Sequence, residues 1–355
     1  MRPVRRYRET IAHVPFPPVE LMQRVGRIED GDVVAGYDAV GLQSRARLER
    51  LLPAEWSWDG KRVLDFGCGA GRTLRHFLPE TERADFYGCD IDEPSIAWAE
   101  GHLSPPVRFC LSGERPSLPH PDRFFDLVYA LSVFTHLTDE WAGWLLELHR
   151  VLKPDGFLIA TFLNEGMWAD FGHGEWDEGR VGMTVLKKWN PWNDGGPIVF
   201  HSEWWIREHW GRAFEIEFLE RSDPEDEASS GASGQGAAVL RPRPNPPDPQ
   251  RLREPADDSR EVAALEHNVE QLHQEAAELS DQLVRMLGWH SALAEEHESS
   301  IDEAGRLRLG LEQTRGQLAE ANDAMLELAT SHSWRLTAPL RAGRAVLSRR
   351  GRAKP

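Results

Sequence analysis

A glycine-rich motif directly after a short apolar run constrains this chain more than any other feature. In VLDFGCGAG, Asp65 and three glycines, Gly67, Gly69 and Gly71, occupy alternate positions. Glycine permits backbone conformations, and a close approach of a ligand to the backbone, that a Cβ atom would obstruct. The following stretch, TLRHFL, predicts a helix whose first N–H groups are free to receive a carboxylate or another acceptor. The motif therefore predicts a strand-to-helix turn that holds a ligand.

Short apolar runs alternate with helical stretches from residue 61 onward. The runs are RVLDFG, ADFYGCD, VRFCLS, FFDLVYAL and GFLIATF. This alternation is typical of a parallel sheet flanked by helices. The stretch 163–203 interrupts it, and FEIEFLE (214–220) and GQGAAVLRPR (234–243) then resume strand-like patterns. The sequence therefore predicts an α/β domain, preceded by a helical segment over residues 1–59.

The glycine spacing separates two classes of nucleotide-binding loop. A dinucleotide-binding loop needs G-x-G-x-x-G, but the third position after Gly67 and Gly69 is Arg72. The observed D-x-G-x-G-x-G resembles the first motif of class I S-adenosylmethionine (SAM)-dependent methyltransferases, and the resemblance covers most of residues 60–243. It implies a Rossmann-like, seven-stranded, mostly parallel sheet with strand order 3-2-1-4-5-7-6. It also implies SAM as the cofactor.

The resemblance assigns further residues to the cofactor. Asp90 ends the second run, where a carboxylate can accept hydrogen bonds from both ribose hydroxyls. Read from the sequence alone, Asp90 could instead cap the following helix. The resemblance implies that Ile91 and Asp92 line the same site and that the loop after the third run contacts the adenine. The expected cofactor-binding residues are Asp65, Gly67, Cys68, Gly69, Gly71, Asp90, Ile91, Asp92, Ser112, Gly113, Glu114 and Ser132.

Two histidines are candidates for the catalytic base. Methyl transfer from SAM is an in-line displacement with a cationic leaving group, so the protein mainly supplies positioning and, for a hydroxyl acceptor, a base. FDLVYALSVFTHL resembles the strand-four segment of the same methyltransferases and ends on His136, whose neutral imidazole can take a proton near pH 7. His201, in VFHSEWW, is the second candidate. Either histidine could instead be structural. No metal site is expected.

Seven of the fourteen tryptophans lie between residues 168 and 210, where the resemblance places the acceptor side. Aromatic faces stack on the apolar faces of sugar rings, while neighbouring polar side chains bind hydroxyls. The same tryptophans could simply pack a cover over the sheet. The segment therefore leaves two interpretations open, a sugar-binding surface and a structural cover.

Charge and cysteine usage bear on partners and compartment. The net charge of −17 argues against nucleic acid, whose binding depends on Lys and Arg. The three cysteines lack the spacing of metal ligands and fit a reducing compartment. No stretch approaches the roughly 18 apolar residues of a membrane helix. We therefore expect a cytoplasmic protein.

The C-terminal third carries a heptad pattern. Its apolar residues step alternately by three and four positions, from Val262 through Leu265, Val269, Leu272, Ala276, Leu279 and Leu283 to Met286. The same phase continues to Leu328 through a polar middle that places His290 and His297 on the seam. This periodicity predicts a coiled coil and hence a homo-oligomer. The sequence leaves open whether the helix is continuous or folds back near Gly288.

The last residues differ in charge from the rest of the chain. From 332 to 355 there are seven basic residues and no acidic one. SHSWRLTAPLRAGRAVL resembles a segment that ends many bacterial glycosyltransferases and methyltransferases of surface-polysaccharide synthesis. The resemblance implies a glycosyltransferase partner. An arginine-rich segment with interleaved apolar residues can also contact an anionic membrane surface, or remain a solvated tail.

The combined prediction is a five-part chain. It comprises a helical cap (1–59), a methyltransferase domain (60–243), a Pro-rich linker (244–258), a coiled coil (259–331) and a basic tail (332–355). The expected reaction is SAM-dependent O-methylation of a sugar hydroxyl in surface polysaccharide or glycan synthesis. The alternatives are methylation of a small metabolite and a non-catalytic SAM-binding scaffold.

Overall fold

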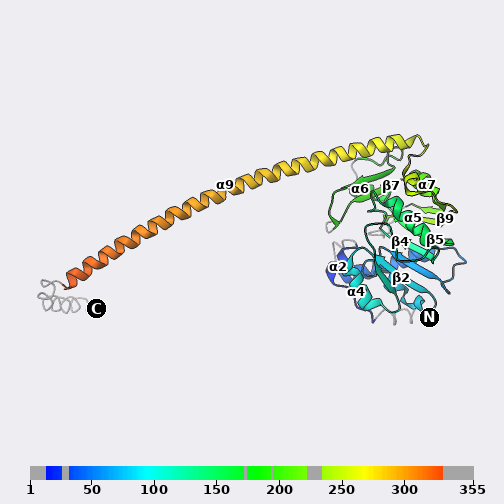
Figure 1. Cartoon of the computed structure of the whole chain (residues 1–355), viewed down its shortest axis with the longest axis horizontal. Helices are drawn as coiled ribbons and strands as arrows, with labels where there is room; N and C mark the ends of the chain where they lie inside the picture. The colour runs from blue at the N-terminus through cyan, green and yellow to red at the C-terminus, as the bar shows by residue number, and fades with distance from the viewer. Residues whose placement is uncertain (1–12, 26–31, 172–173, 193–194, 222–233, 331–355) are drawn as a thin grey trace, which may run out of the picture. The chain divides into compact units, whose positions relative to one another are not determined.

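The computed structural model describes residues 13–25, 32–171, 174–192, 195–221 and 234–330 (Figure 1). It divides into two compact units, 1–276 and 277–355, and the boundary falls inside the last helix. The predicted basic tail lies outside the described residues. No helix among those described is long and apolar enough to cross a membrane.

The first unit is built on one seven-stranded sheet (Figure 1). Its strands are β1 (Arg62–Phe66), β2 (Asp85–Asp90), β3 (Arg108–Leu111), β4 (Phe125–Ala130), β5 (Leu152–Phe162), β8 (Phe214–Glu220) and β9 (Gly236–Pro242). The spatial order is β3-β2-β1-β4-β5-β9-β8. Neighbouring strands are parallel except for β9, which is antiparallel to both β5 and β8. This confirms the predicted Rossmann-like fold and strand order.

Helices cover both faces of the sheet because consecutive residues of a strand point to opposite sides. The helical elements are α2 (Val19–Gln23), α3 (Val33–Leu51), the 3₁₀ helix η1 (Leu74–Glu82), α4 (Glu93–Leu103), α5 (Trp141–Val151), α6 (Glu165–Phe171), α7 (Glu203–His209), the 3₁₀ helix η3 (Trp210–Arg212) and α8 (Pro249–Arg253). Val63 packs in a core with residues of α3, η1 and α4, whereas Leu64 packs with α5 and α7. Near-continuous apolar strands are expected in such a doubly covered sheet.

The stretch predicted as an insertion contains a second sheet. Strands β6 (Met183–Leu186) and β7 (Ile198–His201) form an antiparallel pair. This pair packs with α6 around a small core that includes Trp168 and Phe200. Val199 N–H donates to the Thr135 carbonyl at 2.8 Å, which joins the pair to the loop after β4.

The Pro-rich segment 244–258 packs on the first unit. It contains α8, whose Leu252 is fully buried in the main core. The Arg212 guanidinium donates to the backbone carbonyls of Leu252 and Glu254 at 3.3 and 2.6 Å. One apolar side chain and a set of backbone carbonyls therefore tie the predicted Pro-rich linker to the first unit.

The C-terminal helix α9 (Arg260–Thr330) is a single uninterrupted helix (Figure 1). The alternative in which the chain folds back near Gly288 is therefore not what the structure shows. Residues 260–276 belong to the first unit, and the remainder of α9 belongs to the second.

Candidate functional site: the carboxyl edge of the parallel sheet

The glycine motif forms the loop at the carboxyl end of β1. Gly67, Gly69 and Gly71 have φ values of +81°, +52° and +78°, in the left-handed region that side chains other than glycine rarely adopt. A Cβ on Gly67 would lie 2.4 Å from Val133 Cγ2. The loop is therefore held in a conformation that requires glycine, and it packs directly against the loop that follows β4.

Asp90, at the end of the neighbouring strand, faces this loop. Its carboxylate accepts the Gly69 N–H at 2.7 Å and the Asp92 N–H at 2.9 Å. The helix cap is Asp92, which accepts the Ser95 N–H at 3.1 Å at the start of α4. The alternative role of Asp90 as a helix cap is therefore not the one seen, and its half-buried carboxylate stands beside the glycine loop.

Asp65 is buried directly beneath the loop. Burial raises the pKa of its carboxyl to about 8, nearby Asp90 raises it further, and a hydrogen bond from Tyr129 and the charge of Arg72 oppose the shift. Burial also raises the pKa of Asp90. Two carboxyl groups are thus held in surroundings that disfavour their charged forms. SAM carries an ammonium and a sulfonium, so these residues fit a cationic cofactor.

The burial of Asp65 predicts a pH-dependent stability for the SAM-free protein. Its folded pKa of about 8 lies above the ordinary aspartate value of 3.8, so between these pH values the folded protein holds a proton that the unfolded chain has released. This contribution is complete below about pH 4 and is lost as the pH rises to about 8. We expect the Asp65→Asn variant to lose this slope in denaturant titrations at several pH values. Equal slopes in both proteins would contradict the assignment.

The remaining predicted cofactor residues lie around the same edge with unequal exposure. Ser112 is buried, and its N–H donates to the Asp90 carbonyl at 2.8 Å, which fixes the loop after β3 beside the end of β2. Gly113 and Glu114 in that loop are exposed, as is Ile91 after β2. Cys68 is buried and packs close to Gly88. The exposed residues are the ones that can line a ligand, and Cys68 contributes packing.

The segment before α3 also contacts the loop, which sequence reasoning missed. Arg24 forms an ion pair with Asp92. The Arg72 guanidinium donates to the Val25 carbonyl at 2.8 Å, and a Cβ on Gly69 would lie 2.7 Å from Val25 Cγ1. No sequence motif marks this segment, because the contact joins residues far apart in the chain.

A polar network fixes the loop after β4. Ser132 has a φ of +59°, and its N–H donates to Thr161 Oγ1 at 2.7 Å. Gln235 Nε2 donates to Ser132 Oγ at 2.9 Å, and Thr161 Oγ1 donates to Gln235 Oε1 at 2.7 Å. The sequence predicts a place for Ser132 at this edge but gives no signal for Gln235. Together these bonds join the loop to β5 and β9.

His136 lies in this loop with a defined ring orientation. Its Nδ1 is 2.7 Å from the Pro197 carbonyl oxygen, just before β7. A carbonyl only accepts, so Nδ1 carries the proton, and in the neutral ring Nε2 carries the lone pair. Burial lowers the pKa of His136 below its usual value, which favours that neutral ring. The geometry is that of a base with one nitrogen held and the other available.

His201, the second candidate base, is in a different environment. It is fully buried on β7, and neither ring nitrogen has a hydrogen-bond partner among the described residues. The rings of Trp205 and Trp210 lie 5.3 and 5.4 Å from its own. Burial lowers its pKa to about 3. Because the His201 ring is enclosed by other side chains, it is poorly placed to contact a methyl acceptor. The sequence could not indicate this burial.

The seven tryptophans of the 168–210 region differ in burial: four are buried, Trp176 is partly buried and two are exposed. The buried ones, which pack the cores, are Trp168, Trp204, Trp205 and Trp210. Trp189 and Trp192 are exposed, and the Trp192 ring centroid is 5.9 Å from that of His136. The buried tryptophans therefore form a structural cover, and one exposed ring, that of Trp192, lies near the candidate base.

Comparisons with known proteins agree with this site. Residues 64–160 match a family described as "Methyltransferase domain". The chain is 33% identical over 162 residues to a malonyl-[acyl-carrier protein] O-methyltransferase of Halorhodospira halophila, covering 41% of this chain and 51% of that protein. It is 30% identical over 150 residues to a fatty-acid O-methyltransferase of Mycolicibacterium smegmatis, covering 38% of this chain and 54% of that protein. The chain thus spans about half the length of these relatives.

A solved structure of a SAM-dependent methyltransferase from Mesorhizobium loti aligns with 55% of this chain and 96% of its own, at 19% identity and a TM-score of 0.41. The family match covers β1 to β5 almost completely, the strands that carry the glycine loop, Asp90 and the His136 loop. The family match places a methyltransferase domain over residues 64–160, on the Rossmann-like sheet that carries the glycine loop.

Proposed function

We propose that this chain is a SAM-dependent methyltransferase that methylates a hydroxyl oxygen, with His136 as the base. The observation that carries the proposal is the orientation of the His136 ring, whose Nδ1 is held by the Pro197 carbonyl. Val133, in the same loop, packs against Gly67 of the cofactor loop. The candidate base and the cofactor loop are therefore neighbours at the carboxyl edge of the sheet, where open α/β sheets bind their ligands.

The residues have distinct roles in this proposal. When bound, SAM supplies a methyl group on a positively charged sulfur, which an oxygen nucleophile can attack in line. A bound cation favours the charged forms of Asp65 and Asp90, whose carboxylates then offset the positive charge of the cofactor, and Asp90 can accept hydrogen bonds from its ribose. His136 Nε2 takes the acceptor's hydroxyl proton as the new C–O bond forms and the C–S bond breaks. The products are a methyl ether, the neutral thioether and a protonated His136.

The proposed acceptor is a sugar hydroxyl in surface polysaccharide or glycan synthesis. Two exposed rings, Trp189 and Trp192, support this proposal, because such rings can stack on the apolar face of a sugar. The resemblance of the C-terminal segment to polysaccharide enzymes supports it from the sequence, with a glycosyltransferase as the proposed partner. In this proposal the basic tail operates at the inner face of a membrane, where it would hold the enzyme near lipid-linked acceptors.

Methylation of a small metabolite is the second candidate. Relatives that match this chain are named for a fatty acid, malonyl-[acyl-carrier protein] and ubiquinone biosynthesis. The deciding experiment measures SAM consumption by the full chain against lipid-linked sugars, nucleotide sugars, fatty acids and quinol precursors, with SAM binding measured in parallel. Turnover of sugars alone supports the proposed acceptor, and turnover of the other classes alone supports the alternative. SAM binding without turnover of any of these classes would indicate a non-catalytic SAM-binding scaffold.

Trp192 is expected to affect acceptor affinity more than the chemical step. Trp192→Ala removes a ring that is 64% exposed beside His136, so we expect KM for the acceptor to rise about tenfold, the loss of about 1.4 kcal/mol of binding. The value of kcat should change little. Trp289→Ala is the matched control, because Trp289 is 85% exposed on α9. Equal KM values for the wild type and the Trp192 variant would remove this tryptophan from the acceptor site.

A further inference from the structure

The first turns of α9 pack on the methyltransferase unit through one face only. The residues of this docked face are Glu261, Ala264, His267, Asn268 and Gln271. Asn268 Nδ2 donates to the Met183 carbonyl at 2.8 Å, and the other four are buried. Ala264 belongs to the main core. Gly182 lies so close to it that a Cβ added to Gly182 would be 3.0 Å from the Cβ of Ala264. The docked face therefore fixes the rotation of the helix about its own axis.

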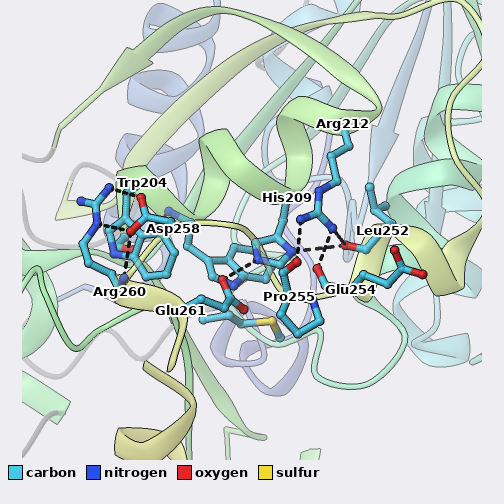
Figure 2. A network of polar contacts seen from close by, with 12 residues as sticks. Trp204, His209, Arg212, Leu252, Glu254, Pro255, Asp258, Arg260 and Glu261 are labelled. Atoms are coloured by element: carbon cyan, nitrogen blue, oxygen red, sulfur yellow. Dashed lines mark hydrogen bonds and ion pairs between the residues drawn. The ribbon is translucent and has the colours of Figure 1, made fainter. Parts of the chain in front are cut away.

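A buried polar network reinforces this docking (Figure 2). His209 lies between two oxygens, with Nε2 3.1 Å from Glu261 Oε2 and Nδ1 3.2 Å from the Leu252 carbonyl. Arg260 pairs with Asp258 at 2.7 Å, and its guanidinium lies 4.9 Å from the centre of the Trp204 ring. The start of α9 is thus anchored by interactions to α7 and to the end of α8.

The heptad seam points away from the docked face. Val262, Leu265, Val269 and Leu272 are 63, 48, 51 and 37% exposed, although the opposite side of the same turns is buried. The stripe continues into the second unit with Leu279, Leu283, Met286, Leu293, Leu307, Leu311, Leu318 and Met325, all at least 44% exposed. Over the turns that belong to the first unit, the seam residues are therefore left uncovered.

A helix with this composition needs a partner along its seam. Helices in proteins gain most of their stability from packing of an apolar face, and interior glycines cost about 1 kcal/mol each relative to alanine. Four glycines, at positions 288, 305, 310 and 316, lie inside α9 in open surroundings. Without contacts along the seam, the exposed leucines would contribute nothing that offsets this cost.

We propose that the α9 seam binds the seam of a second copy of this chain as a parallel, in-register, two-stranded coiled coil. Taking Val262 as heptad position a places Val269 at the next a and Leu265, Leu272 and Leu279 at d. β-Branched residues at a with leucine at d favour two parallel strands. This inference does not depend on the proposed activity.

The charges that flank the seam fit the parallel arrangement. In a parallel pair, position g of one helix faces position e of the other. Glu303 at position g of each copy then faces Arg308 at position e of the other copy, which gives two such pairs in the dimer. In an antiparallel pair, g faces g. Beyond the docked face, position g carries Glu275, Glu296 and Glu303 and no basic residue, so the antiparallel arrangement would give these glutamates no cationic partner, whereas the parallel arrangement gives one to Glu303.

Sedimentation of the full chain at micromolar concentration tests the pairing. We expect the mass of two chains of 40.2 kDa for the wild type and of one chain for Leu283→Glu, which places a charge on the seam. Val284→Glu is the matched control, because the neighbouring Val284 is 65% exposed at the b position, off the seam. This variant should remain a dimer, and the circular dichroism of both variants shows whether they are folded. A monomeric or higher-order wild type, or dissociation of the Val284 variant, would overturn the proposal.

The orientation has its own test. Ala276→Cys places a thiol at position a, where two parallel, in-register copies meet their own counterpart. We expect mild oxidation to join this variant into disulfide-linked dimers. The wild type should stay uncrosslinked, because two of its cysteines are buried and the third, Cys110, is only partly exposed. A sedimenting dimer that resists this crosslinking would indicate the antiparallel arrangement and refute the parallel one.

Discussion

Replacing Gly69 by valine is expected to abolish SAM binding. Gly69 has a φ of +52°, where an L-residue costs about 1–2 kcal/mol and a β-branched one is especially rare. Its new Cβ would also lie 2.7 Å from Val25 Cγ1. The loop must move to relieve both conflicts, and the Gly69 N–H that donates to Asp90 moves with it. We expect affinity to fall at least a hundredfold, measured by calorimetric titration.

A substitution at a second glycine, Gly60, distinguishes a specific loss of SAM binding from a general loss of stability. Gly60 has a φ of +70°, and a Cβ there would meet no heavy atom within 4 Å. Gly60→Val therefore introduces similar backbone strain outside the loop. Both variants should unfold at lower temperature than the wild type, but only Gly69→Val should lose SAM. Loss of binding in both, or in neither, would refute a specific role for the loop at Gly69.

The elements that the sequence predicts well are those encoded locally. Seven runs of the sequence correspond to the seven strands, and the central strands β1 and β4 are buried on both faces and therefore almost continuously apolar. The positive φ values of Gly67, Gly69 and Gly71 follow from spacing alone. The strand order was not available from local pattern and came from the resemblance.

The features that the sequence missed depend on contacts between distant segments. The pairing of β6 with β7 was hidden by the Gly-, Trp- and Asn-rich composition between residues 163 and 203. The packing of α8 depends on one leucine, Leu252, in a Pro-rich stretch. The contact of Val25 with the Gly69 loop joins residues 44 positions apart, and nothing in either segment alone indicates it.

The two candidate histidines also show that the sequence does not indicate contacts between distant segments. Both were candidate bases for the same chemical reason, that a neutral imidazole can take a proton near pH 7. The structure places His136 in a half-buried loop beside an exposed tryptophan, and His201 inside a core of aromatic rings. Residue type therefore identified the chemistry, while burial, which is a tertiary property, separates the two positions.

His136→Ala is expected to lower kcat by a factor of about 10²–10⁴ while sparing SAM binding, the range typical for removal of a general acid or base. His201→Gln is the comparison, because it alters a buried side chain that the proposed chemistry does not use. It should lower the unfolding temperature and leave the kcat of the folded protein within a few-fold of the wild type. Unchanged turnover in the His136 variant would remove that residue as the base.

The pH profile provides an independent readout of the same role. A base acts in its deprotonated form, so activity should be full above the folded pKa of His136 and fall as the pH drops through it. Because burial lowers that pKa from 6.5, the wild type should retain activity at pH values somewhat below 6.5. The residual activity of His136→Ala should lack this acidic limb. If the limb persisted unchanged in the variant, a different group would be taking the acceptor's proton.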